Sequence, residues 1–336
     1  MIFSKDVPGI GEFELMLFAS PEARCLYGLD AVRGLGSPKR AWVFEFSDYE
    51  GAQPRDASIS DVNAVSEYKN NRGEIDRWLD VTGAEKRRVL CSFGLLEPID
   101  NCVGPPNPFN LPLVLDISCA PRGRLLALFD YLARCQAKTG QRVHLMYTLV
   151  QRHAVDEGAF SYGIQDIAVV PGFNGVIRLR RDLLIIVLGF EGNRAFSLYR
   201  RLMPNMTYLI LGDSGDTDRE FYLSQSETNN RSLLCIHGNE KLTMASRDPV
   251  LFAKQLDGFL KGRVEPVQGR YNVYFSCLGT KLQTLGAYLA IRAHRYIQVI
   301  DTIPSRRRIG STGKGQTVFA DLGSSGLLQR ISDLAE

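Results

Sequence analysis

Residues 271–290, with the sequence YNVYFSCLGTKLQTLGAYLA, decide the fold class of this chain. The first seven residues form an apolar run typical of a buried strand, Gly279 marks a sharp turn, and a helix is expected to begin at Thr280 and Lys281. A buried strand followed directly by a helix is the repeating element of parallel α/β sheets. The start of a helix exposes backbone N–H groups and the positive end of the helix dipole, so this junction attracts anions.

The turn itself has residues suited to a phosphate. Gly279 lets a ligand approach the backbone, Thr280 offers a hydroxyl, and Lys281 adds a full positive charge. The alternative is an ordinary strand-to-helix junction in which Thr280 is the N-cap. These three residues alone leave both interpretations open.

The same alternation of apolar runs and helical patterns continues along most of the chain. Residues 183–188, LLIIVL, are the most apolar and suit a central strand. In the helix expected at 124–135, the apolar residues recur at spacings of three and four and lie on one face: Leu125, Leu128, Phe129 and Leu132. Further strands are expected at 41–46, 88–93, 113–118, 143–150, 207–211, 233–236 and 297–303, and further helices at 59–79, 194–202, 216–229 and 249–260.

This order predicts an α/β fold of Rossmann-like type, with a mostly parallel sheet and helices on both faces. A division into two lobes fits the long connection after residue 150, and the sequence leaves open whether the lobes share one sheet. The expected organisation is an N-terminal α/β lobe at 1–150, a connecting region at 151–180, a C-terminal Rossmann-like lobe at 181–303 and a basic, Gly-rich tail at 304–336.

Composition excludes several classes of protein. A net charge of +3 is too small to indicate direct nucleic-acid binding. The seven cysteines are scattered, without a CxxC or a Cys/His cluster, so no metal site is expected. We find neither a secretion signal nor an apolar run of membrane-spanning length, and therefore predict a cytoplasmic protein that does not bind membranes.

Ligands of open α/β sheets gather beyond the carboxyl ends of the strands, so the residues that follow the strands form the candidate site. Three turns supply them: Asp116, Ser118 and Arg122; Phe190, Glu191, Asn193 and Arg194; and Ser276, Gly279, Thr280, Lys281 and Gln283. The cationic side chains suit phosphates, and the aromatic ring suits stacking on a base. The amides suit a base edge or a ribose hydroxyl, and the carboxylates suit ribose hydroxyls.

Each of these residues also has a structural interpretation. Asp116 can satisfy nearby backbone donors, Glu191 can complement a helix dipole, Arg194 can lie on a solvated face, and Phe190 can belong to the core. Residues 306–317 resemble a P-loop, but Gly315 stands where Ser or Thr is required. That stretch is either a basic loop that closes over an anionic ligand or a solvated loop.

No catalytic constellation is evident. The histidines are not paired with a nucleophile in a recognisable motif, and His144 lies within an apolar strand as a core residue would. Cys277 is either a nucleophile near a helix start or, the favoured interpretation, a buried residue at a strand end. No catalytic residue and no cofactor is assigned.

Residues 272–289, and above all Leu278-Gly279-Thr280-Lys281, resemble the Gly-Thr-Lys segment of CARF domains. These are Rossmann-like sensors that bind cyclic oligoadenylates in prokaryotic antiviral defence, and Leu278 replaces the first glycine of the family's Gly-Gly-Thr-Lys turn. The resemblance implies that Gly279, Thr280 and Lys281 contact ligand phosphates. It also implies a homodimer with the ligand bound across a two-fold axis.

Three functions remain open at this point. The favoured hypothesis is a sensor or regulatory subunit that binds a nucleotide or another phosphate-bearing ligand and signals through a dimer or a partner effector protein. The second is a nucleotide-processing enzyme, such as a ring nuclease, a glycosidase or a transferase, which needs an acid near the scissile bond. The third is a structural subunit of a defence complex.

Overall fold

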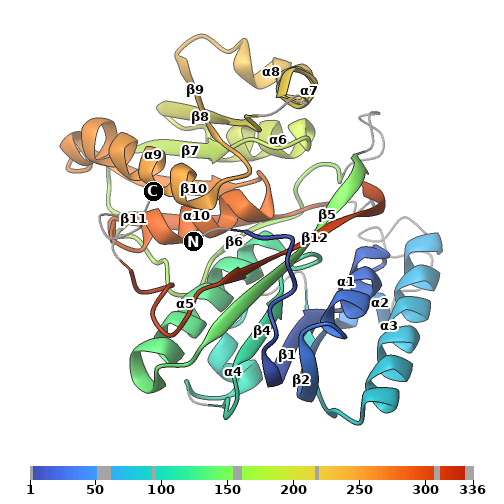
Figure 1. The fold of residues 1–336 in the computed structure, drawn as a ribbon. Coiled ribbons are helices and arrows are strands. Elements are labelled where there is room, and N and C mark those ends of the chain that lie inside the picture. The colour runs from blue at the N-terminus through green and yellow to red at the C-terminus, as the bar shows by residue number, and fades with distance from the viewer. Residues whose placement is uncertain are drawn as a thin grey trace. The chain divides into compact units, whose positions relative to one another are not determined.

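The structure, a computed structural model, describes residues 3–50, 62–92, 96–106, 108–153, 161–215, 219–305 and 311–329. The strands form two six-stranded, mostly parallel sheets, which confirms the predicted α/β, Rossmann-like class (Figure 1). The chain divides into two compact units. The first unit comprises Met1–Pro121, Leu128–Ala159 and Arg306–Gln329, and the second comprises Arg122–Ala127, Phe160–Ser305 and Arg330–Glu336.

The sheet of the first unit has the order β12-β5-β4-β1-β2-β3. Its strands are β1 (Gly11–Phe18), β2 (Gly36–Phe46), β3 (Glu85–Cys91), β4 (Leu113–Asp116), β5 (Val143–His153) and β12 (Ser311–Asp321). All neighbours are parallel except β12, which is antiparallel to β5. The helices are α1 (Arg24–Val32), α2 (Ser47–Glu50), α3 (Val62–Thr82), α4 (Ile99–Val103) and α5 (Arg122–Thr139), whose first residues, Arg122–Ala127, belong to the second unit.

Apolar side chains at the predicted spacing form the buried face of α5. Leu125, Leu128, Phe129 and Leu132 are all fully buried, as the sequence pattern predicted. β1 escaped prediction because two glutamates interrupt its apolar pattern. One of them, Glu14, is buried and accepts hydrogen bonds from the indole N–H of Trp42 (3.1 Å) and the backbone N–H of Asn110 (2.9 Å), which offsets the cost of burying its charge.

The sheet of the second unit has the order β6-β11-β10-β7-β8-β9. Its strands are β6 (Asp166–Val169), β7 (Arg181–Val187), β8 (Met206–Asp213), β9 (Asn239–Ala245), β10 (Tyr271–Cys277) and β11 (Ile297–Ile303). Only β6 is antiparallel to its neighbour. The helices are α6 (Gly192–Leu202), α7 (Arg219–Asn229), α8 (Arg231–Leu234), α9 (Pro249–Phe259) and α10 (Lys281–Ile291), and α9 continues into a π-helical turn (Leu260–Val264) and a 3-10 turn (Glu265–Val267).

Two buried elements centre this unit. The residues of β7 from Leu183 to Val187 are fully buried, because the strand has a neighbour on each side and is covered on both faces. Every residue of α10 after Lys281 is buried, which explains why the helix is apolar all round. A Cβ at Gly286 would lie 2.5 Å from the carbonyl oxygen of Pro249, so this glycine permits α10 to pass close to α9.

Two expectations from the sequence were wrong at the edges of the sheets. The strand expected at 233–236 is instead the short helix α8, and the strand follows as β9, a polar edge strand without an apolar run. The tail expected at 304–336 contains β12, whose glycines and polar residues suit an edge strand and gave no strand signal. Residues 216–218, 306–310 and 330–336 lie outside the described residues. In the part of the chain that the structure describes, no helix is long and apolar enough to span a membrane.

Candidate ligand site in the second unit

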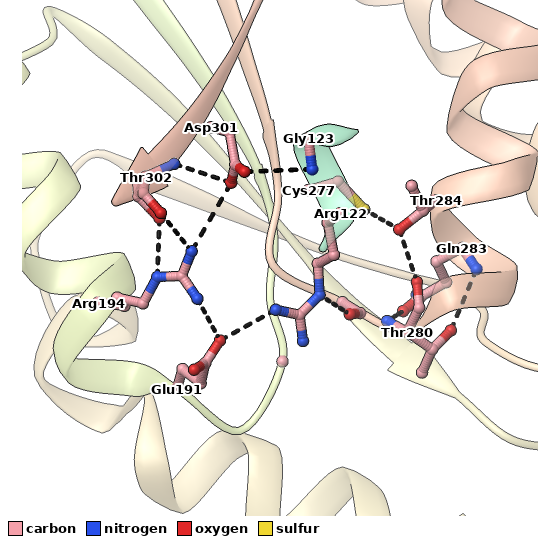
Figure 2. Close-up of polar contacts among 12 residues, drawn as sticks. Arg122, Gly123, Glu191, Arg194, Cys277, Thr280, Gln283, Thr284, Asp301 and Thr302 are labelled. Carbon is pink, nitrogen blue, oxygen red and sulfur yellow. Dashed lines mark hydrogen bonds and ion pairs between the residues drawn. The ribbon is translucent and has the colours of Figure 1, made fainter. Parts of the chain in front are cut away.

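The helix α10 begins with a capping box. The hydroxyl of Thr280 accepts a hydrogen bond from the backbone N–H of Gln283 (3.1 Å), and the backbone N–H of Thr280 donates to the side-chain oxygen of Gln283 (2.9 Å) (Figure 2). The same hydroxyl donates to the carbonyl oxygen of Ser246 (2.9 Å). The N-cap interpretation of Thr280 is therefore confirmed, and Gln283 contributes to the cap from a buried position.

Close packing at this turn explains why residue 279 is a glycine. A Cβ at this position would lie 2.3 Å from Oε1 of Gln283 and 2.9 Å from a methyl group of Val187. The glycine is thus needed for the capping box to form. Lys281, the first residue of α10, is half-buried, whereas the N-cap Thr280 is exposed.

Arg122 reaches the same turn from another helix. It is the first residue of α5, and its Nε donates to the carbonyl oxygen of Gly279 at 2.6 Å. Its Nη1 donates to Oε2 of Glu191 at 3.0 Å, which is also an ion pair (Figure 2). Arg122 therefore joins the turn after β10 to the turn after β7.

Arg194 is the second arginine of this cluster and is buried. Its Nη1 donates to Oε2 of Glu191 at 2.7 Å, its Nε donates to the hydroxyl of Thr302 at 2.8 Å, and its Nη2 donates to the carbonyl oxygen of Thr302 at 2.5 Å. Oδ1 of Asp301 lies 3.7 Å from the guanidinium. The solvated-face interpretation of Arg194 is wrong: this side chain binds the end of β11 to the start of α6.

Glu191 lies between the two arginines. Burial alone would raise the pKa of its carboxyl, but the charges of Arg194 and Arg122 outweigh burial and lower that pKa to about 2. The carboxylate is therefore ionised throughout the neutral range. The cluster has a fixed internal anion with a cation on each side.

Asp301 serves as the cap of a different helix. Its Oδ2 accepts a hydrogen bond from the backbone N–H of Gly123 (3.1 Å) in the first turn of α5, and its Oδ1 accepts from the backbone N–H of Thr302 (2.8 Å). A Cβ at Gly123 would lie 2.4 Å from Oδ2, so the glycine admits the carboxylate to the helix start.

The turn after β7 is held by backbone packing and by two asparagines. A Cβ at Gly189 would lie 2.2 Å from the carbonyl oxygen of Leu278, and one at Gly192 would lie 1.8 Å from that of Asn229. Side-chain amides of Asn229 and Asn230 donate to the carbonyl oxygens of Phe190 (3.0 Å) and Gly189 (2.8 Å). This arrangement requires both glycines of the turn for its shape.

Phe190 and Asn193, the other predicted residues of this turn, are half-buried. The ring of Phe190 lies 6.1 Å from that of Tyr222, centroid to centroid. Ser276 is fully buried in β10, and its hydroxyl has no hydrogen-bond partner among the described residues. Ser276 lies in the interior of the sheet beside Ile186 of β7.

Asp116 and Ser118 belong to the first unit and are described separately. The backbone N–H of Ser118 donates to Oδ1 of Asp116 at 2.9 Å, and the hydroxyl of Ser118 donates to the same oxygen. The hydroxyl of Ser118 also accepts a hydrogen bond from the backbone N–H of Thr148 at 2.8 Å. Burial raises the pKa of Asp116 to about 6, against the opposing influence of Ser118 and Arg24. The structural interpretation of Asp116, a carboxylate that satisfies nearby donors, agrees with these bonds.

The other groups weighed as catalytic are buried. The thiol of Cys277 lies 3.6 Å from the hydroxyl of Thr284, and burial raises its pKa above the ordinary value, so the thiolate is disfavoured. His144 is buried beside Asp321, and burial lowers its pKa. Within the described ranges, no group of three or more His, Cys, Asp or Glu side chains is arranged to hold a metal ion.

Sequence reasoning missed four members of the cluster. Asp301 and Thr302 lie at the end of the expected strand at 297–303, Gly123 follows the predicted Arg122, and Ser246 lies beyond a strand that was not predicted. An acid and a hydroxyl at the end of a predicted strand were the available signal. No sequence pattern indicated that Asp301 would cap a helix far away in the chain.

Comparison with known proteins adds little to this description. No protein-family model matches the chain, and no curated protein matches it. Among solved structures, a 16S rRNA methyltransferase of T. thermophilus (RsmC), in complex with AdoMet and guanosine, is similar over 94% of this chain and 90% of that chain, with 13% sequence identity and a TM-score of 0.20. A similarity of this strength supports no functional argument.

Proposed function

We propose that the second unit binds a phosphate-bearing ligand of nucleotide type at the turn between β10 and α10, and that the chain acts as a sensor or regulatory subunit. The resemblance of this turn to CARF domains adds cyclic oligonucleotides as the favoured ligand class and antiviral defence as the setting. Both parts rest on the chemistry of the turn and on that resemblance.

The observation that carries the proposal is the position of Arg122. Its guanidinium lies on the carbonyl oxygen of Gly279, immediately before the helix that Lys281 begins. Two cationic residues of two different helices, Arg122 and Lys281, therefore lie at one helix start, where the dipole already favours an anion. A phosphate group at this position would gain charge-assisted hydrogen bonds from both.

The acids of the cluster favour binding over turnover. Glu191 is paired with two arginines and has a pKa of about 2, so it cannot donate a proton near neutral pH. Asp301 is committed to the backbone N–H groups of Gly123 and Thr302. A general acid for the nucleotide-processing alternative would have to come from elsewhere.

Titration calorimetry tests the proposal with ATP, NAD and cyclic oligoadenylates as probes. Lys281→Ala is expected to weaken binding by about 1.5–3 kcal/mol, the scale of a charge-assisted hydrogen bond. Lys241→Ala is the matched control, because Lys241 is an exposed lysine of β9 paired with Glu227, and its removal should leave the affinity unchanged. Equal affinities for the wild type and Lys281→Ala would remove the turn from the site.

Chromatography of the nucleotide after incubation separates the sensor from the enzyme. Intact nucleotide after prolonged incubation with binding protein supports the sensor. Conversion that saturates with nucleotide and requires Lys281 would replace it with the enzyme hypothesis. An absence of binding by every probe would leave the structural subunit as the remaining hypothesis.

A further inference from the structure

The two sheets have the same strand order. When the strands of each unit are numbered in chain order from its first parallel strand, β1 and β7 correspond, and so do β2 and β8, β3 and β9, β4 and β10, and β5 and β11. Both sheets then have the order 5-4-1-2-3, with one antiparallel strand added beside the fifth.

The correspondence extends to register. Three consecutive rows of paired residues cross the first, fourth and fifth strands in each unit. The first of these rows consists of Glu14, Leu113 and Val143 in the first unit, and of Leu183, Val273 and Ile297 in the second. Counting from this row gives equivalent positions in the two units without any sequence alignment.

The same residue types occur at the positions so defined. In both units a glutamate lies eight residues after the residue of the first strand that belongs to this row: Glu22 follows Glu14, and Glu191 follows Leu183. In both units a threonine lies five residues after the residue of the fifth strand that belongs to this row: Thr148 follows Val143, and Thr302 follows Ile297. An arginine follows each glutamate within the first turn of the next helix.

These residues make the same contacts. In the first unit, Nε and Nη2 of Arg24 donate to the carboxylate of Glu22 at 3.0 and 2.5 Å, and Nη1 donates to the carbonyl oxygen of Thr148 at 3.4 Å. Arg194 contacts the equivalent partners of its own unit, donating to Glu191 through Nη1 and to the carbonyl oxygen of Thr302 through Nη2. Both arginines are more than nine-tenths buried, Arg24 at 8% exposure and Arg194 at 7%.

The antiparallel strands are exchanged between the halves of the chain. β6 follows β5 in the sequence but pairs with β11 of the second unit, and β12 follows β11 but pairs with β5 of the first. Figure 1 shows β12, in red, running beside β5, in green. Each sheet is therefore completed by the strand that follows the fifth strand of the other.

We infer that the chain is an internal duplication of one α/β unit whose antiparallel edge strands have been exchanged between the two copies. The inference stands independently of the ligand proposed above.

Hydrogen exchange with mass spectrometry tests the strand exchange on the full chain. The N–H of Phe319 bonds to Ser4, so the N–H groups of its neighbours, including Val318, point to the opposite side of β12, toward β5. Val318→Pro removes one of these donors and is expected to speed exchange in β5 on the order of tenfold or more, with β11 unchanged. Val318→Ala is the matched control and keeps the donor.

The reciprocal variant is Ala168→Pro in β6, which should speed exchange in β11 and leave β5 unchanged. Faster exchange of β11 in Val318→Pro, or of β5 in Ala168→Pro, would overturn the exchanged arrangement. A proline variant can unfold the whole unit to which its edge strand belongs. Protection from exchange is then lost in the central strand of that unit and kept in the central strand of the other, where the central strands are β1 and β7.

Discussion

Replacing Glu191 with glutamine removes one charge from the centre of the candidate site with little change of shape. In the folded protein the pKa of this carboxyl is lowered from 4.5 to about 2, mainly by Arg194 and Arg122 acting against burial. That difference corresponds to about 3 kcal/mol of stabilisation at pH 7. The side chain is only 13% exposed, so solvent screens this interaction weakly. We therefore expect Glu191→Gln to destabilise the second unit by about 3 kcal/mol at neutral pH.

The stability difference between the wild type and Glu191→Gln is expected to depend on pH, because folding lowers the pKa of Glu191. A carboxyl whose pKa is depressed by folding stabilises the protein above its unfolded-state pKa, and that contribution is lost as the pH falls from about 4.5 toward 2. The difference between wild type and variant should therefore be constant from pH 7 to about 5.5 and shrink to about half or less by pH 3.

The assay must distinguish the two units. Both tryptophans, Trp42 and Trp78, lie in the first unit, so their fluorescence during urea unfolding reports that unit. Far-UV circular dichroism reports both units, and hydrogen exchange in β7 and β11 reports the second. The expected result is an earlier circular dichroism transition and faster exchange in β7 and β11.

Glu240→Gln is the control for Glu191→Gln. Glu240 pairs with Arg263 at the surface, and its removal should cost about 1 kcal/mol or less. A loss below about 1 kcal/mol for Glu191→Gln, or a loss that stays the same down to pH 3, would refute the assignment of the low pKa to the two arginines.

Three further substitutions test the packing. Leu128→Ala, at a fully buried position of α5, should destabilise the protein by about 2–5 kcal/mol in urea unfolding, and a loss below about half a kcal/mol would contradict the assigned helix face. Thr280→Ala should cost about 1 kcal/mol by removing the cap of α10, while serine at the same position should retain most of it; equal stability of the two variants would argue against the cap. Gly192→Ala should cost about 1–3 kcal/mol because its Cβ would meet the carbonyl oxygen of Asn229, whereas Gly258→Ala, with open space around it, should be neutral or stabilising by up to about 1 kcal/mol in the same thermal-unfolding comparison.

The sequence predicted the buried elements whose covered positions are apolar without interruption. β7 and the face of α5 gave clear signals of this kind, whereas β1 is buried but was missed because Glu14 interrupts its apolar run. Edge strands give no such signal. β9 and β12 each have a partner on one side in their sheets, so polar residues and glycines are tolerated and no apolar run marks them.

The candidate site was predictable by residue type and not by partner. Arg122, Glu191 and Arg194 were all expected near a ligand, because charged residues just after strands are unusual enough to notice. Their pairing is a property of the fold: Arg122 and Glu191 are 69 residues apart in sequence. The same side chains that suit a phosphate also satisfy one another, and only the structure shows that two of the three guanidinium nitrogens of Arg122 are engaged by Gly279 and Glu191.

The two turns that the duplication relates have little sequence in common. The turn after β1 is FASPEAR, ending at Arg24, and the turn after β7 is VLGFEGNR, ending at Arg194. They share one glutamate and one arginine, at spacings of two and three residues, which is too little to recognise within 336 residues. What has been retained is the geometry: a buried arginine that neutralises a glutamate in the turn after the first strand and donates to a threonine carbonyl on the fifth. Apolar positions around such a pair can change as long as volume is kept, whereas loss of the glutamate takes the nearest counter-ion from a buried guanidinium, at a cost of about 3–5 kcal/mol. Selection for stability alone is therefore sufficient to retain the pair in both units while the surrounding sequence diverges.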